Sequence, residues 1–348
     1  MANLAISNVC NLNCPYCFAA AYMSQTIGTA RPFITIEAFT QRLDFLERSH
    51  ISQVRLIGGE PTLHPQFTTL VQLARQRGFT VLVFTHGLVR ARPLTCLTTL
   101  SPDDCMVLVN MNATRSGSVP DAAETAQREA VIRQLGSRAL LGFNIYRPQF
   151  NLEPLLALIQ KANCHPAIRL GLAQPILDGA NVYLHPKQYP AVGRQLAQFA
   201  RRAAADGVRL EFDCGFVRCM FSDEELALLQ EAGADVAWRC NPILDISLDE
   251  RAIHCFPLTG RVETAVAAQD APTLRQQLIV QTQVYRRAGI YRECSFCPHK
   301  RQGTPPGACT GGCLAQTMRR FRHQNLRFVL PAPTVGQGCQ PALLGEIR

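Results

Sequence analysis

Three cysteines near the start of the chain are spaced to hold a metal cluster. Cys10, Cys14 and Cys17 lie in the sequence CNLNCPYC. A [4Fe–4S] cluster normally takes four cysteines, so three thiolates leave one iron open to a chelating ligand. The same spacing also fits a zinc site that lacks its fourth ligand, or a set of redox thiols. The loop by itself predicts thiolate chemistry and leaves these alternatives open.

A second motif, Gly58-Gly59-Glu60-Pro61, directly follows the apolar run at 54–57. Two glycines allow the backbone to approach a ligand closely, and the glutamate supplies an acceptor for an ammonium group. Taken alone, this sequence is a common turn at the end of a strand. Its position after the cysteine loop makes it a candidate ligand-binding turn.

Together the two motifs resemble the signature of the radical S-adenosylmethionine (SAM) superfamily. In that family an aromatic residue precedes the third cysteine and another follows it, as Tyr16 and Phe18 do here. The resemblance implies that SAM chelates the open iron. It also implies that an electron from the cluster cleaves SAM to methionine and a 5′-deoxyadenosyl radical, which removes a hydrogen atom from the substrate.

The resemblance extends to individual contacts with SAM. It implies that Tyr16 lies near the adenosyl group, that the backbone beside Phe18 contacts the adenine, and that the Gly-Gly-Glu-Pro turn grips the amino group. Thr85-His86-Gly87 resembles the Thr-Asn-Gly strand end of the family, with His in place of Asn. Further candidates at strand ends, which also fit ordinary capping roles, are Thr85, His86, Asn110, Asn112, Asn144 and Gln174.

Cysteine is abundant in the second part of the chain as well. The sequence holds 15 cysteines, too many for an ordinary cytosolic enzyme, and a chain of 348 residues does not need a disulfide scaffold. Seven of them occur in an order that resembles the SPASM extension, whose members carry two auxiliary [4Fe–4S] clusters. They are Cys240, Cys255, Cys294, Cys297, Cys309, Cys313 and Cys339.

By position, the resemblance implies one ligand set for each auxiliary cluster. The first set is Cys240, Cys255 and Cys313 with one upstream cysteine, and the second is Cys294, Cys297, Cys309 and Cys339. Two departures weaken the pattern: the usual glycine before Cys255 is replaced, and the gap between Cys297 and Cys309 is longer than usual.

Two cysteines compete for the upstream position. Cys219 is preferred because its spacing to Cys240 is closer to that of relatives, and Cys214 is then a candidate hydrogen-atom or proton donor to the substrate. The alternative for the whole region is structural zinc, since two cysteine pairs, Cys294/Cys297 and Cys309/Cys313, fit a zinc ribbon. Three other cysteines lie in or beside apolar stretches and are expected to be small core residues: Cys96, Cys105 and Cys164.

The elements that position these residues follow from the hydrophobic pattern. β-rich runs alternate with amphipathic stretches up to about residue 213, which predicts β–α units around a parallel sheet and a partial (β/α)6 barrel. In such sheets the loops after the carboxyl ends of strands carry the chemistry. The expected strands are 4–8, 53–57, 80–85, 106–110, 140–145, 167–172 and 208–212, and the expected helices include 35–48, 67–77, 122–135, 152–162 and 189–205.

After residue 213 the alternation fails, and cysteine, proline and glycine become frequent. The sequence RQGTPPGACTGG at 301–312 does not predict regular structure. We therefore expect a barrel at 1–213 and a loop-rich iron–sulfur extension at 214–348, packed against each other.

Composition excludes several classes of protein. No run of about 18 apolar residues is present and the start of the chain is not a signal peptide, so we expect no membrane span and a cytoplasmic location. The net charge of +9 is spread over scattered basic pairs. That distribution disfavours nucleic-acid binding and favours an acidic substrate or partner peptide.

The resemblance also suggests what the enzyme acts on. Many relatives oxidise or crosslink ribosomally made peptides, so a peptide is the leading substrate class. The runner-up is a dehydrogenase or rearrangement enzyme for a sugar, nucleotide or amino acid, and a zinc-binding interaction module is the distant rival. The expected partners are a reductant such as flavodoxin or ferredoxin and a separate leader-peptide-binding protein, because no fused peptide-recognition domain precedes the first expected strand.

Overall fold

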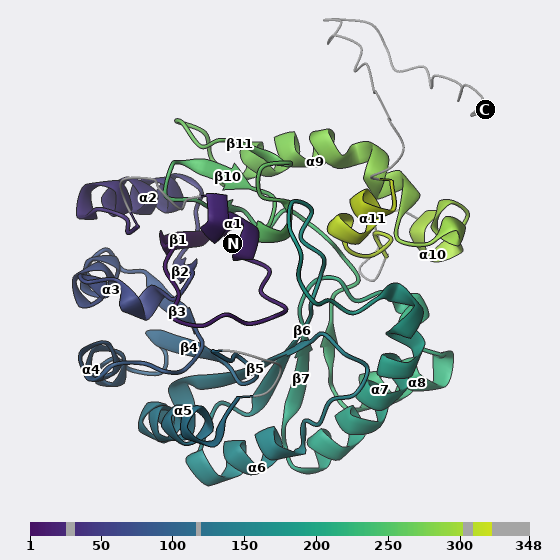
Figure 1. Ribbon diagram of the computed structural model, residues 1–348, viewed down its shortest axis with the longest axis horizontal. Coiled ribbons are helices and arrows are strands. Elements are labelled where there is room, and N and C mark those ends of the chain that lie inside the picture. Colours follow the sequence, from purple (N-terminus) through teal and green to yellow (C-terminus); the bar gives the residue numbers. More distant parts are fainter. Residues whose placement is uncertain (26–31, 116–119, 302–308, 322–348) are drawn as a thin grey trace, which may run out of the picture.

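The computed structural model describes residues 1–25, 32–115, 120–301 and 309–321. Within them one sheet runs in the order β11-β10-β9-β1-β2-β3-β4-β5-β6-β7-β8 (Figure 1). Its strands are β1 (Asn3–Ser7), β2 (Gln53–Gly58), β3 (Thr80–Thr85), β4 (Cys105–Asn110), β5 (Ala139–Ile145), β6 (Ala167–Leu172), β7 (Arg209–Phe212), β8 (Asp235–Val236), β9 (Asp245–Ile246), β10 (Arg251–Ile253) and β11 (Glu263–Ala265).

Helices connect these strands and surround the curved sheet (Figure 1). They are α1 (Ala20–Gln25), α2 (Ile36–Arg48), α3 (Phe67–Gln76), α4 (Ala91–Thr99), α5 (Ala122–Leu135), α6 (Glu153–Ala162), α7 (Tyr189–Ala205), α8 (Asp223–Glu231), α9 (Ala271–Ala288), α10 (Pro298–Arg301) and α11 (Leu314–Arg320). In the described part of the chain, no helix is long and apolar enough to cross a membrane.

The barrel strands follow the expected alternation. The seven predicted strands and the five predicted helices form within one residue of their expected bounds. Neighbouring strands from β1 to β8 pair in parallel, and β8 and β11 are the two open edges of the described sheet. The expected α/β fold with a partial barrel is confirmed.

Strand β4 illustrates how the sheet positions side chains. Successive side chains of a strand point to opposite faces. Cys105, Val107 and Val109 are buried in the main core, whereas Leu108 and Asn110 on the other face are half-buried. Asn110 is thus the last residue of β4 on the face opposite the main core, at the carboxyl end of the strand. Cys105 and Cys164 are buried in the core and Cys96 packs against it, as expected.

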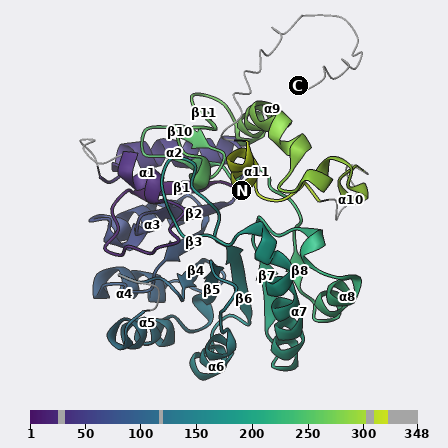
Figure 2. The same cartoon turned by 45° about the vertical axis from the view of Figure 1, so that its right-hand side comes forward.

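The sheet continues across the expected boundary at residue 213. Strand β8 extends it beyond β7, and β9 pairs in parallel with β1 through Asn3↔Asp245 and Leu4↔Ile246. Strands β10 and β11 follow in antiparallel pairing, α9 packs beside β11, and α11 packs against α9 (Figure 2). The change of sequence pattern after residue 213 therefore does not separate two sheets.

A buried carboxylate connects the extension to the first strand. Asp245 Oδ1 accepts from Asn3 Nδ2 at 2.7 Å, and its Oδ2 accepts from the backbone N–H of Phe256 at 2.8 Å. Burial raises the pKa of Asp245 to about 7. Both donors lie in the interior, where an unpaired polar group is costly.

We predict that removing this carboxylate destabilises the fold. Asp245→Ala leaves two buried donors unpaired and should lower the free energy of unfolding by about 1–3 kcal/mol for each. Asp245→Asn keeps one acceptor and should cost less. Urea unfolding followed by circular dichroism measures both, with the exposed Asp103→Ala as control. Equal stability of Asp245→Ala and Asp103→Ala would contradict the role of Asp245.

Candidate active site

The two glycines of the turn after β2 pack against the backbone that leads into the cysteine loop. Gly59 N donates to Ser7 O at 2.9 Å, and Glu60 N donates to Val9 O at 2.8 Å. A Cβ atom at Gly58 would lie 1.9 Å from Ser7 O, and one at Gly59 would lie 2.3 Å from Val9 O. The close approach that the sequence assigned to a ligand is therefore made by the chain itself.

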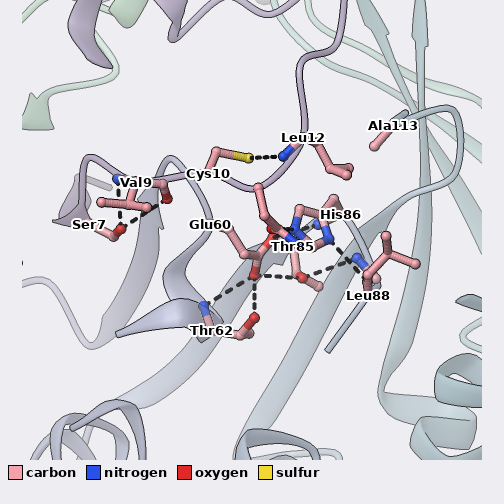
Figure 3. Close-up of polar contacts among 12 residues, drawn as sticks. Ser7, Val9, Cys10, Leu12, Glu60, Thr62, Thr85, His86, Leu88 and Ala113 are labelled. Carbon is pink, nitrogen blue, oxygen red and sulfur yellow. Dashed lines mark hydrogen bonds and ion pairs between the residues drawn. The ribbon is translucent and has the colours of Figure 1, made fainter. Parts of the chain in front are cut away.

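The Glu60 carboxylate joins the ends of β2 and β3 (Figure 3). Oε1 accepts from Thr62 N at 3.1 Å and from the hydroxyls of Thr62 at 2.6 Å and Thr85 at 2.8 Å. Oε2 accepts from His86 N at 2.9 Å. A carboxylate has about four acceptor sites. Three of these bonds reach Oε1 and one reaches Oε2, which also lies 3.2 Å from His86 Nε2. The chain therefore fixes this carboxylate at the start of a 3-10 turn (Pro61–Leu63), and its contact with an ammonium group stays a prediction.

The His86 imidazole connects β3 to the cysteine loop. Its Nδ1 accepts from Leu88 N at 3.0 Å, so Nε2 carries the hydrogen and donates to Asn11 Oδ1 at 2.8 Å. Burial lowers the pKa of His86, which keeps the ring neutral. Both ring nitrogens have partners in the chain. In this arrangement His86 positions the loop, and its contact with SAM stays a prediction.

Arg128 supports the same strand ends and was not singled out from the sequence. It lies on α5, is 1% exposed, and donates from Nε to His86 O and from Nη2 to Ala113 O, each at 2.8 Å. An arginine within a helix usually marks a solvated face. Its helical spacing from Ile132 and Leu135 could have indicated that Arg128 lies on the buried side of α5.

The three N-terminal thiols lie close together. Cys14 and Cys17 both contribute to raising the pKa of Cys10, although burial is the largest cause and brings it to about 12. Burial also raises the pKa of Cys17 to about 11. Backbone N–H groups point at two of the sulfurs: Leu12 N lies 3.4 Å from Cys10 Sγ, and Thr114 N lies 3.3 Å from Cys14 Sγ.

This donor set fits an iron–sulfur cluster. Desolvated thiols resist ionisation unless a cation neutralises them, and N–H groups aimed at sulfur are typical of cluster sites. Three converging cysteines satisfy three irons and leave the fourth open, as the spacing predicts.

Four of the predicted SAM-contacting residues meet at the ends of β4 and β5. The Tyr16 hydroxyl donates to Asn112 Oδ1 at 3.2 Å and accepts from Asn110 Nδ2 at 3.1 Å. Asn112 Nδ2 donates to Asn144 O at 2.8 Å. The Tyr16 ring stacks on Tyr146 with centroids 4.7 Å apart. Asn110 Oδ1 is buried and accepts no hydrogen bond among the described residues, so a ligand hydroxyl placed there would satisfy it.

Two other candidates have different side-chain neighbours. Phe18 is 43% exposed and stacks near Phe256 at 6.3 Å. Gln174 is buried, with neither side-chain polar atom hydrogen-bonded within the described chain. A Cβ atom at Gly215 would lie 2.6 Å from Gln174 Nε2 and 3.9 Å from Cys313 Cβ. Gln174 Nε2 thus lies beside the turn at Gly215, while Asn181 Nδ2 donates to both Gln174 O and Tyr16 O.

The described C-terminal cysteines fall into two groups, each defined by thiols whose charges act on one another. In the first, burial and then the charges of Cys240 and Cys214 raise the pKa of Cys255. A hydrogen bond from the Cys313 thiol lowers the pKa of Cys240. Arg286 on α9 donates to Cys240 O at 2.6 Å and lies near these thiols. The members of this first group are Cys214, Cys240, Cys255 and Cys313.

Most of the second group lies in the segments just before and after α10. Burial raises the pKa of Cys219 to about 11, followed by the charges of Cys309, Cys294 and Cys297. Burial lowers the pKa of Lys300, and the charges of the same three thiols act in the opposite direction. The second group is thus Cys219, Cys294, Cys297 and Cys309. Cys339 lies outside the described residues.

The charge of Cys214 acts on Cys255 and Cys313, whereas the charges that act on Cys219 are those of Cys309, Cys294 and Cys297. The preference for Cys219 as the upstream ligand of the first cluster, and the zinc-ribbon alternative, stay predictions. Within the described ranges, no three His, Cys, Asp or Glu side chains are close enough to hold a single metal ion.

We predict that Gly59→Ala impairs assembly of the N-terminal cluster. The new Cβ would displace Val9 and Cys10, so iron per chain after anaerobic reconstitution should fall by up to about four. Gly78→Ala is the matched control, because its φ of +81° strains alanine while nothing lies within 4 Å of its Cβ. Full iron in Gly59→Ala, or equal loss in both variants, would contradict this role of Gly59.

Comparisons with known proteins agree with this geometry. Residues 4–117 match the Radical SAM superfamily. The mycofactocin maturase MftC of Mycobacterium ulcerans (strain Agy99) is 27% identical over 89% of this chain and 81% of its own length. MftC of Mycobacterium tuberculosis (strain ATCC 25618 / H37Rv) is 25% identical over 98% of this chain and 84% of its own length.

Solved structures share the fold. Native anSMEcpe with bound AdoMet has a TM-score of 0.62 at 12% identity, covering 92% of this chain and 95% of that chain. Streptococcus suis SuiB bound to S-adenosylmethionine also has a TM-score of 0.62 at 12% identity, covering 91% and 74%. The chain is a radical SAM enzyme with a SPASM-like C-terminal extension, and its cofactors include SAM and a [4Fe–4S] cluster at the SAM site.

Proposed function

We propose that this enzyme uses the radical formed from SAM to oxidise or crosslink a ribosomally synthesised peptide. The main support is the extent of the similarity to mycofactocin maturases, which covers 89% and 98% of the chain. Structures of the same fold carry peptides: anSMEcpe with the Kp18Cys peptide, at a TM-score of 0.60, and SuiB with its precursor peptide SuiA, at 0.54.

Enzymes named for small molecules match much less of the chain. GTP 3′,8-cyclase of Edwardsiella ictaluri (strain 93-146) is 32% identical over 26% of it. The 7,8-dihydro-6-hydroxymethylpterin dimethyltransferase of Methanocaldococcus jannaschii is 37% identical over 23%. A match of this extent supports shared SAM chemistry and leaves the substrate unassigned. The peptide is therefore the better-supported substrate class.

We assign Cys10, Cys14 and Cys17 as ligands of the SAM-site cluster, which when bound supplies the electron that cleaves SAM. Next to it, the Tyr16 ring and the free Asn110 Oδ1 offer a stacking surface and an acceptor for the adenosyl portion. The other residues of this site keep those groups in place: Glu60, Thr85, His86, Asn112 and Asn144.

We further propose that the two C-terminal cysteine groups hold auxiliary [4Fe–4S] clusters. The Arg286 guanidinium beside Cys240 and Cys255 offsets negative charge at the first group, as the Lys300 ammonium does at the second. Such clusters would accept the electron that remains after substrate oxidation. A flavodoxin or ferredoxin as electron donor, a separate leader-peptide-binding protein and a cytoplasmic location complete the proposal.

We predict that SAM cleavage depends on the N-terminal thiols. Anaerobically reconstituted protein given dithionite and SAM should form 5′-deoxyadenosine, measured by liquid chromatography and mass spectrometry. Cys14→Ala should abolish this product, because the cluster loses one of its three protein ligands. Cys96→Ala, a change at a core cysteine outside the loop, is the control. Wild-type levels of product from Cys14→Ala would exclude the assignment.

We predict that the substrate is encoded beside the enzyme as a short open reading frame. Its peptide, deuterated at side-chain carbons, should transfer deuterium to 5′-deoxyadenosine and lose hydrogen itself, both seen by mass spectrometry. The scrambled peptide is the control. If no peptide transfers deuterium while a sugar, nucleotide or amino acid from neighbouring pathway genes does, the small-molecule alternative replaces the peptide.

A further inference from the structure

Two arginines face the inside of the curved sheet, away from the helices that surround it (Figure 1). Successive side chains of a strand point to opposite faces. On β2, Arg55 lies between Val54 and Leu56, which both belong to the main core, so its own side chain is on the inner face. Arg169 holds the same position on β6, between two other core residues. Both arginines are half-buried in the middle of paired strands.

The two guanidinium groups meet at the ring of Phe84 on β3. Arg55 pairs with Leu82, and Phe84 follows two residues later on the same face of the neighbouring strand. From the other side, the guanidinium carbon of Arg169 lies 5.3 Å from the centroid of the Phe84 ring. The side chain of Arg169 thus reaches across β4 and β5, which separate β6 from β3 in the sheet. Burial, followed by the charge of Arg169, lowers the pKa of Arg55 to about 10, so both groups are cationic at neutral pH.

One of these two cations has a counter-ion in the chain. Arg169 Nη2 donates to Asp213 Oδ2 at 2.8 Å, and Asp213 Oδ1 accepts from Cys214 N at 2.8 Å. Arg55 donates from Nε to the neutral Gln53 Oε1 at 2.8 Å and forms no ion pair among the described residues. The rest of its guanidinium fork is therefore available to a ligand.

The other carboxylates near this face are bound elsewhere. Glu211 lies opposite Arg169 on β7, but its carboxylate pairs with Arg209 at 2.7 Å. Asp245 uses one oxygen for Asn3 and the other for a backbone N–H. The inner face thus presents two guanidinium groups to one carboxylate, and a partly desolvated charge without a partner is unfavourable. A second carboxylate, supplied by a ligand, would remove this imbalance.

This charged layer borders both ends of the reaction. Phe84 packs on a small cluster that includes Ile57 and is also contacted by Cys17 of the SAM-site loop. At the other end, Asp213 directly precedes Cys214, a member of the first group of cysteines. A substrate that gives a hydrogen atom to the radical and an electron to the first group has to approach both places. The layer therefore lies where a substrate group can reach it.

We propose that Arg55 and Arg169 bind a carboxylate of the substrate on the inner face of the barrel. A guanidinium group binds a carboxylate through two parallel N–H bonds, and Asp213 keeps that of Arg169 oriented. The carboxylate comes from an acidic side chain or from the C-terminus of a peptide, since both present the same chemistry. This inference rests on the proposed peptide function and makes the bound part of the peptide acidic.

The test measures binding of three small probes to the full-length, reconstituted enzyme by saturation-transfer-difference NMR. N-acetylalanine carries a terminal carboxylate, N-acetylglutamate α-amide a side-chain carboxylate, and N-acetylglutamine α-amide none. A carboxylate probe should bind and the neutral probe should not, and the probe that binds more tightly identifies the source.

Variants assign this binding to the two arginines. Arg55→Gln should raise the Kd of the bound probe at least about tenfold, because it removes charge-assisted hydrogen bonds. Arg55→Lys, which keeps the charge and loses the fork, should raise it less. Arg169→Gln should also weaken binding, because Asp213 is then free to pair with Arg55. The exposed Arg92→Gln removes the same charge elsewhere and should leave the Kd unchanged.

Phenylglyoxal, which modifies arginine, gives a measurement that needs no substitution. In the wild-type enzyme the carboxylate probe should protect Arg55, while Arg92 is modified equally with every probe, as mapped by mass spectrometry. Equal binding of charged and neutral probes, or no protection of Arg55, would overturn the site even if a peptide transfers deuterium. Carboxylate binding at Arg55 without deuterium transfer from any peptide would instead overturn the peptide as its source.

Discussion

The buried Glu60 carboxylate is the contact on which the active site depends. It accepts hydrogen bonds from the ends of β2 and β3, and through His86 it is linked to Asn11 in the cysteine loop. Arg128 adds the segment after β4 to this network, because it donates to both His86 O and Ala113 O. Each of these donors is buried or half-buried, and leaving one unpaired costs about 1–3 kcal/mol. The strand ends and the cysteine loop are therefore positioned as one unit.

This network explains why a loop without regular structure can present three thiols in a fixed arrangement. Gly58 and Gly59 allow β2 to lie directly against the backbone that enters the loop, and His86 supports its first turn. The remaining polar groups at the site belong to Tyr16 and the asparagines after β4 and β5. They leave Asn110 Oδ1 available for a ligand.

The extension is structurally continuous with the barrel. Strand β9 pairs with β1, the strand that leads into the SAM-site loop, and Asp245 fixes that pairing from within. The first group of cysteines lies around the same junction, since Cys255 precedes Phe256, which donates to Asp245. The electron-accepting site that we propose is thus part of the sheet that holds the SAM site.

The sequence by itself determined the elements and the chemistry. The alternation of β-rich runs with amphipathic stretches predicted the bounds of the barrel strands within one residue. It could do so because the hydrophobic period of a strand or helix is a local property of the sequence. The spacing of Cys10, Cys14 and Cys17 predicted the open iron, because three ligands within one loop are a local property. The Gly-Gly-Glu-Pro turn is likewise a local motif, and the sequence alone identified it as part of the site.

Only the tertiary structure decided which distant residues meet. It showed that Glu60 and His86 hydrogen-bond within the chain, that Arg128 is buried against the same strand ends, and that β9 of the extension pairs with β1. These outcomes depend on contacts between residues far apart in the sequence. Linear spacing carries no information about such contacts, so they required the fold.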